Sequence, residues 1–299
     1  MPEVNALPVF LCAQLRRLPC QGWACTPWND DFLMTAIQES RAWFPFGAGG
    51  EDAHTRLFCL PFAGGGASNF LPWRARLAEA GVGVAPVQYP GHETRLGEAP
   101  LHAWEEMLAA LQAALVPLLD RPYALFGYSM GARLAFALAA RLAAAGMAPV
   151  RLIVAAHVPP DLPSPALQAA GLDDQAFKAL LLRYGGIPAE ISHEQEFWDL
   201  TLPLMRADFA LAAAPLDADA DVAAMAAAAS YPIAAYAGID DVHADAKSMA
   251  GWGRFTTAGF ILREFAGDHF FLRGADVCQA LNTDLALARS ADLSSLVSA

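Results

Sequence analysis

The sequence predicts an α/β fold in which helices flank both faces of a mostly parallel central sheet. From Arg56 onward, short β-rich runs alternate with longer helical runs. The β-rich runs are almost continuously apolar, which is typical of strands that are buried on both faces. A helical segment at about 157–230 interrupts the alternation, and we interpret it as a lid inserted at the carboxyl ends of the strands. An extra helical layer without a gating role is the alternative.

The elements follow one another in a regular order. The expected strands are Leu57–Leu60, Val82–Tyr89, Tyr123–Phe126, Arg151–Ala155, Pro232–Ala237 and Phe260–Phe265. The expected core helices are Phe70–Ala80, Ala103–Leu119, Ala132–Ala145, Ala244–Trp252 and Ala275–Ala288. The expected lid helices are Asp174–Tyr184, Glu194–Phe209 and Asp217–Ala229. Strands that alternate with helices of this length indicate a parallel sheet.

Composition narrows the class of protein. A formal charge of −12 over 299 residues argues against binding to nucleic acid or to an anionic membrane surface. No apolar run is long enough to span a membrane, and the five irregularly spaced cysteines fit neither a zinc site nor a disulfide framework. We therefore expect a cytoplasmic protein, active as a monomer.

The first fifty residues differ from the rest. We expect 1–50 to be an extension that is peripheral or partly disordered, and 51–299 to form one domain that contains the lid. Residues 1–33 hold three of the five cysteines and show no clear hydrophobic periodicity, so they are interpreted as lying upstream of a natural start at Met34. An ordered arm packed on the domain is the alternative.

The most informative motif is G-x-S-x-G at residues 127–131, directly after an expected strand and directly before an expected helix. A sharp turn between strand and helix lifts the hydroxyl of its central serine, Ser129, out of the sheet. We therefore predict that Ser129 is a nucleophile. The alternative is an ordinary turn in which a serine caps the helix.

A serine nucleophile needs a base, and the base needs an orienting carboxylate. In this fold the chain order is serine, acid, histidine. Asp241 follows the fifth expected strand and His269 follows the sixth, so both are expected at the same sheet edge as Ser129. Asp240 and Asp161 are alternative acids. The other histidines on strand-end loops are His92, His157 and His243. A metal site at Asp240, Asp241, His243 and Asp245 is a weaker alternative, and we predict no metal.

Backbone N–H donors complete the predicted chemistry, because attack on an acyl group places negative charge on its carbonyl oxygen. One donor is expected at Met130, the residue after the nucleophile. The other is expected in the glycine-rich loop 61–66, after the first strand. This loop lacks the G-x-G-x-x-G pattern and the lysine that phosphate-binding loops carry.

Taken together, the motifs resemble those of type II thioesterases, which accompany polyketide synthases and nonribosomal peptide synthetases. The matching segments are Leu57–Gly65, Tyr89–Glu93, Phe126–Ala132, Tyr184–Pro188, Leu204–Phe209 and Gly267–Leu272. They run in the family's order from about residue 57 to 290, and residues 1–50 lie outside the resemblance.

The resemblance implies an α/β-hydrolase with a helical lid, a triad of Ser129, His269 and Asp241, and oxyanion donors at Ala63 and Met130. It implies removal of acyl groups from the phosphopantetheine arm of carrier proteins in transient encounters. No cofactor is implied beyond the arm that the substrate carries. Release of products, a carboxylesterase or acyltransferase activity, and a non-catalytic binding protein are the alternatives.

Three side chains are candidates for contact with substrate. Phe62 and Tyr128 stand where the family often has His, so the resemblance implies an altered pocket wall. Arg206 lies in the expected lid. It is a candidate for contact with the pantetheine arm or a carrier, and the alternative is an ion pair within the lid, for example with Asp208. His92 stands where Arg is common, and Val242 follows the acid where Pro is common.

Overall fold

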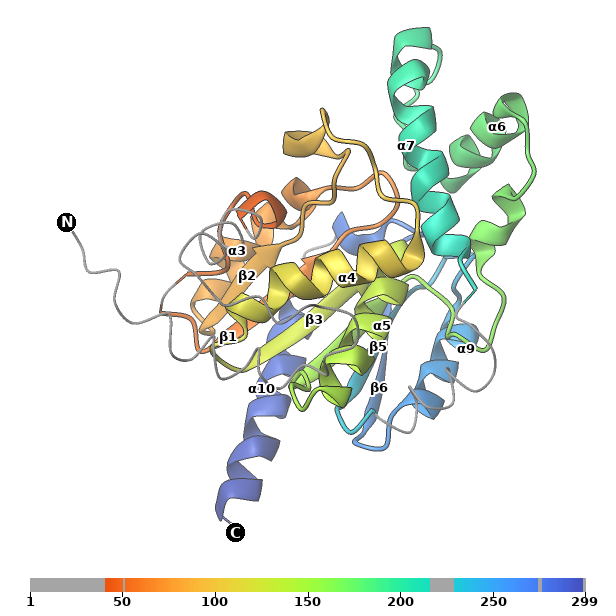
Figure 1. Cartoon of the computed structure of the whole chain (residues 1–299). Coiled ribbons are helices and arrows are strands. Elements are labelled where there is room, and N and C mark those ends of the chain that lie inside the picture. Colours follow the sequence, from red (N-terminus) through yellow and green to blue (C-terminus); the bar gives the residue numbers. More distant parts are fainter. Residues whose placement is uncertain (1–40, 51, 216–228, 274–275, 298–299) are drawn as a thin grey trace, which may run out of the picture.

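The computed structural model describes residues 41–50, 52–215, 229–273 and 276–297 (Figure 1). Most of the expected extension and all but the last residue of the expected helix Asp217–Ala229 lie outside the described residues. None of the helices in the described parts of the chain is long and apolar enough to cross a membrane.

A six-stranded, all-parallel sheet forms the centre of the molecule, which confirms the predicted fold class. Its order is β2-β1-β3-β4-β5-β6. The strands are β1 Thr55–Leu60, β2 Val82–Pro86, β3 Tyr123–Tyr128, β4 Arg151–Ala155, β5 Ile233–Gly238 and β6 Phe260–Phe265. β2 ends earlier than the expected Tyr89, because the N–H of Gln88 donates to the carbonyl of Trp43 rather than to the sheet.

The order of the strands creates a crevice where the site is expected. The chain steps outward from β1 to β2 and then crosses back to β3 on the other side of β1. The loops that leave the carboxyl ends of β1 and β3 therefore diverge, and ligands of open α/β sheets bind at such a reversal. The glycine-rich loop follows β1, and Ser129 follows β3.

Helices cover both faces of the sheet (Figure 1). The helices are α3 Leu71–Ala78, α4 Trp104–Leu115, α5 Met130–Ala144, α9 Ala246–Met249 and α10 Asp276–Val297. α3 and α10 pack on one apolar face, and α4, α5 and the segment around Trp252 pack on the other. The helix expected at Ala244–Trp252 is a single α turn followed by a 3₁₀ turn, Ala250–Phe255, which contains the poor helix formers Gly251 and Gly253.

The predicted lid contains the 3₁₀ turn Pro165–Ala169 and two helices, α6 Asp174–Tyr184 and α7 Gln195–Ala213, which project from one end of the sheet (Figure 1). The Asp173 carboxylate caps α6 by accepting the N–H of Ala176 at 2.8 Å, and Gly185 ends it in a left-handed conformation. At the end of α7, the guanidinium of Arg133 on α5 donates to the carbonyl of Ala214, which fastens the lid to the core.

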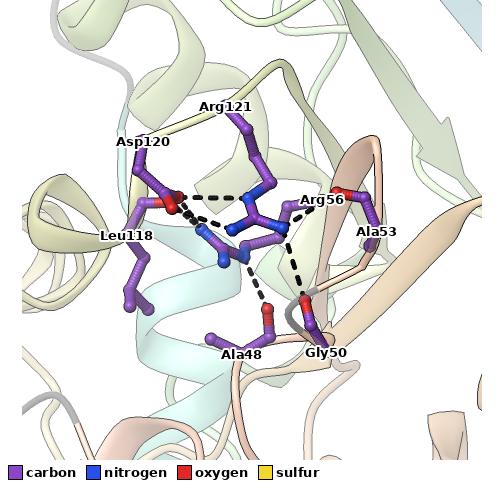
Figure 2. A network of polar contacts seen from close by, with 7 residues as sticks. All are labelled: Ala48, Gly50, Ala53, Arg56, Leu118, Asp120 and Arg121. Carbon is purple, nitrogen blue, oxygen red and sulfur yellow. Dashed lines mark hydrogen bonds and ion pairs between the residues drawn. The ribbon is translucent and has the colours of Figure 1, made fainter.

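Residues 41–50 pack onto the domain. Trp43 and Phe44 are 6% and 4% exposed and belong to the apolar core. Near the amino end of β1, the buried Arg56 donates to the carbonyls of Ala48 and Leu118 and pairs with Asp120 (Figure 2). These contacts hold the segment before β1 against the loop before β3.

Candidate active site

Ser129 occupies a strained turn between β3 and α5. Its φ of 51° and ψ of −115° lie outside the regions that L-residues ordinarily adopt, and strain of this kind is concentrated at functional sites. The turn fits only because its neighbours are glycines. A Cβ at Gly127 would lie 2.2 Å from the Gly131 carbonyl oxygen, and a Cβ at Gly131 would lie 2.2 Å from the Leu60 carbonyl oxygen.

A hydrogen-bonded chain links the three polar side chains that the sequence singled out. His269 Nε2 lies 3.1 Å from Ser129 Oγ, and His269 Nδ1 lies 2.9 Å from Asp241 Oδ2. Asp241 follows β5 and His269 follows β6, so the parallel sheet brings both to the edge where Ser129 leaves β3. Asp241 and His269 are buried, whereas Ser129 is partly open to solvent.

The environment of Asp241 favours its ionised form. Burial alone would raise the pKa of this carboxyl group. The hydrogen bond and charge of His269, with the backbone N–H groups of His243 and Ala244, outweigh burial and lower the pKa below its usual value. These N–H groups donate to Asp241 Oδ1 at 2.8 and 3.2 Å, which leaves Oδ2 for the imidazole. An ionised carboxylate in this position requires a proton on His269 Nδ1, so Nε2 is free to accept the proton of Ser129.

A small pocket opens over Ser129 and is lined mainly by apolar side chains from the core and from the lid. The residues that line it are Ala63, Ser129, Met130, Ala156, His157, Pro165, Ala166, Tyr184, Phe209, Ala212 and His269. Met130 is the first residue of α5, so the helix supplies no acceptor for its N–H. Ala63 lines the pocket from the glycine-rich loop, and the two expected backbone donors therefore flank the same space as the serine.

Tyr128 and Phe62 lie beside the polar chain, outside the residues that line the pocket. Tyr128 is fully buried, and its hydroxyl donates to the backbone carbonyl of His269. Phe62 packs edge-on against Tyr128 and against Phe270, with ring centroids 5.9 and 5.4 Å apart. Tyr128 thus supports the loop that carries His269, a contact that its position in the sequence gave no sign of.

The remaining histidines on strand-end loops have other partners. His157 lines the pocket, and burial lowers its pKa to about 3, so it is neutral. His243 stacks on Tyr184 with ring centroids 4.1 Å apart. His92 lies 2.9 Å from Asp208 on α7.

The alternative acids lie elsewhere. Asp240 is exposed, and Asp161 pairs with Arg254. In the described segments, no cluster of three His, Cys, Asp or Glu side chains is arranged to hold a metal ion.

Arg206 and Asp208 do not pair with each other. The Arg206 guanidinium binds the Asp174 carboxylate at 2.6 Å and the Leu172 carbonyl at 3.0 Å within the lid. Arg206 borders a second hollow between the lid elements. This hollow shares Ala166 and Phe209 with the pocket over Ser129.

Comparison with known proteins agrees with this geometry. The family model of the thioesterase domain matches residues 55–285, which is most of the chain. The chain belongs to the thioesterase family. It is a type II thioesterase, a serine hydrolase of the kind found in nonribosomal peptide and polyketide biosynthesis, as the sequence predicted.

Named relatives cover most of the chain. The gramicidin S biosynthesis protein GrsT of Aneurinibacillus migulanus is 31% identical over 80% of this chain and 91% of its own. The thioesterase PikA5 of Streptomyces venezuelae is 34% identical over 79% of this chain and 83% of its own. The solved structure of the type II thioesterase BorB, from the borrelidin biosynthetic cluster, is 32% identical with a TM-score of 0.68, over 81% of this chain and 95% of that chain.

Proposed function

We propose that this thioesterase hydrolyses acyl thioesters held on the phosphopantetheine arm of carrier proteins, through an acyl-enzyme on Ser129. In this proposal His269 is the general base, Asp241 orients it, and the N–H groups of Ala63 and Met130 bind the oxyanion. The observation that carries the proposal is the hydrogen-bonded chain from Asp241 through His269 to Ser129, which ends at a pocket between core and lid.

Acylation begins when His269 Nε2 takes the proton of Ser129 and the serine oxygen attacks the thioester carbonyl. The adjacent carboxylate of Asp241 stabilises the imidazolium that forms. Negative charge develops on the carbonyl oxygen, and two backbone donors in a fixed arrangement lower the energy of that state. The carbon–sulfur bond then breaks, His269 returns the proton to the departing pantetheine sulfur, and an ester on Ser129 remains.

Deacylation repeats these steps with water as the nucleophile. His269 Nε2 removes a proton from a water molecule that attacks the ester carbonyl, and Ser129 leaves with that proton. Lid residues Pro165, Ala166 and Phe209 line the pocket, and these apolar side chains limit the access of bulk water to the reacting atoms.

Apolar lid residues provide space for the acyl group. The pocket over Ser129 and the hollow between the lid elements share Ala166 and Phe209 in their linings, which supports an acyl path from the serine into the lid. Arg206 borders the far part of this path and remains a proposed contact for substrate. Phe62 and Tyr128 are proposed to influence the site through their packing around the His269 loop.

Hydrolysis by the Ser129→Ala variant tests the assignment. This change removes the nucleophile and leaves the fold intact, so activity on an acyl carrier protein should vanish while the thermal unfolding temperature stays close to that of the wild type.

A simple ester of the same acyl group tests the class of substrate. Faster turnover of that ester than of the acyl carrier protein, at equal concentration, would favour a carboxylesterase instead.

A further inference from the structure

A buried carboxylate on the lid helix α7 contacts both the glycine-rich loop and the segment after β2. Asp208 on α7 is 1% exposed and His92, on the segment after β2, is 2% exposed, with His92 Nε2 2.9 Å from Asp208 Oδ2. The same carboxylate oxygen accepts the backbone N–H of Gly64 at 2.6 Å. Gly64 directly follows Ala63, which lines the pocket over Ser129. A single carboxylate thus connects three segments that are far apart in the sequence.

The hydrogen bonds of His92 require its charged form. Nε2 faces the Asp208 carboxylate, and Nδ1 lies 3.0 Å from the carbonyl oxygen of Pro90. Both partners are acceptors, so both ring nitrogens must carry a proton. Burial alone would lower the pKa of His92, but the bond and charge of Asp208 outweigh it and raise the pKa above 6.5. Among the described residues, the other groups that face His92 are Glu93, whose charge also favours the imidazolium, and the ring of Tyr89.

Packing around this contact leaves the loop little freedom. Gly64 has a φ of +76°, and a Cβ there would lie 2.6 Å from the sulfur of Met205 on α7. On the other side of the loop, Glu93 accepts the N–H of Ser68 at 3.1 Å. The orientation of the Ala63–Gly64 peptide is therefore determined by α7 and by the segment that contains His92.

We propose that His92 and Asp208 are positioning residues for the oxyanion loop, and that the charge of His92 keeps the loop and the lid helix α7 in the arrangement needed for hydrolysis. When His92 loses a proton, one ring nitrogen faces an acceptor without a hydrogen, and the buried Asp208 carboxylate loses its compensating charge. The Gly64 N–H is then held less firmly and Ala63 is displaced from its place at the pocket. The raised pKa makes this an alkaline effect, because the imidazolium is present below that pKa and is lost as pH rises through it.

The inference rests on the proposed role of Ala63 as an oxyanion donor, and its test uses the full chain with hexanoyl-pantetheine as the probe. In His92→Gln, which cannot carry charge, we expect kcat to fall about 10- to 100-fold with KM changed by less than about threefold, because misplaced groups reduce the rate of chemistry rather than binding. In His92→Arg, which stays charged, we expect kcat to be largely retained and the alkaline decline of the wild type to disappear.

Asp284→Asn is the matched control. Asp284 is fully buried and pairs with Arg263, on the sheet face that α10 covers. Its loss should lower the unfolding temperature and leave the pH profile of kcat unchanged. NMR titration of the His92 ring should show two N–H protons near neutral pH.

The His92 variants test the positioning role, and Ser129→Ala tests the proposed hydrolysis. Wild-type kcat in His92→Gln would overturn the inference, as would an alkaline decline in His92→Arg at the same pH as in the wild type. If His92→Gln fails to fold, the comparison of wild type with His92→Arg decides. Activity in Ser129→Ala would instead overturn the proposed function, whatever the His92 variants do.

Discussion

Asp241→Asn is the substitution that tests the geometry of the polar chain most sharply. Asp241 Oδ1 accepts the backbone N–H groups of His243 and Ala244, and only an oxygen can take that place in the variant. The amide oxygen of Asn is therefore fixed there, and its NH₂ group faces His269 Nδ1 across the 2.9 Å contact. An N–H donor at Nδ1 requires that nitrogen to be unprotonated, which moves the proton of the neutral imidazole to Nε2.

With its proton on Nε2, His269 cannot accept the proton of Ser129, which lies 3.1 Å away. Loss of the correct tautomer in a serine–histidine–aspartate site costs about 10⁴-fold in kcat, or about 5.5 kcal/mol of transition-state stabilisation. We expect a loss of this size in release of thiol from hexanoyl-pantetheine, with little change in the unfolding temperature. Asp240→Asn is the control, because its side chain is exposed beside the same turn. A kcat within tenfold of wild type in Asp241→Asn, on the order of 1.4 kcal/mol, would refute the assignment.

Three further results are expected. Gly127→Ala should lower the free energy of unfolding by about 1–3 kcal/mol or more, because the added methyl group overlaps the Gly131 carbonyl oxygen. An unchanged denaturation midpoint would contradict this expectation. Tyr128→Phe leaves the His269 carbonyl without its donor, so stability should fall by about 1–3 kcal/mol and kcat should fall more than KM rises; an unaltered kcat would show that this contact has no role in positioning His269. Burial lowers the pKa of His157 to about 3, so its imidazole is neutral in the folded protein. Between pH 6.5 and 3 the unfolded chain binds a proton at this residue and the folded chain does not. The free energy of unfolding should therefore decline as pH falls through this range. Urea titrations of wild type and His157→Gln should show a smaller decline in the variant, and equal declines would contradict this account.

The sequence was sufficient to predict that three polar side chains meet at one edge of the sheet, because the order of parallel strands determines which loops share that edge. Ser129, Asp241 and His269 each follow a strand, and the carboxyl ends of parallel strands share one edge. Local patterns were also sufficient for β1 to β5, because their apolar runs are buried throughout the sheet. The edge strand β6 is half-buried along most of its length and carries Arg263 and Glu264.

Other features depend on contacts that no local pattern encodes. The contact between His92 and Asp208 joins residues 116 positions apart, and each side chain alone resembles an ordinary surface residue. The hydroxyl of Tyr128 reaches a backbone carbonyl 141 positions away, which depends on how the β6 loop folds back over β3. Arg206 pairs with Asp174 because α6 and α7 pack together, whereas the sequence alone offered Asp208 as a nearer partner.

Isolation of the acyl-enzyme tests the central claim most directly. Rapid mixing with a hexanoyl carrier protein, acid quenching and mass spectrometry of peptides should show one added hexanoyl group on the peptide that contains Ser129. The adduct should be absent from Ser129→Ala and should form far more slowly in His269→Ala, which lacks the base for acylation. Hydrolysis of the carrier thioester at the wild-type rate by Ser129→Ala, or acylation of a different residue, would contradict the account.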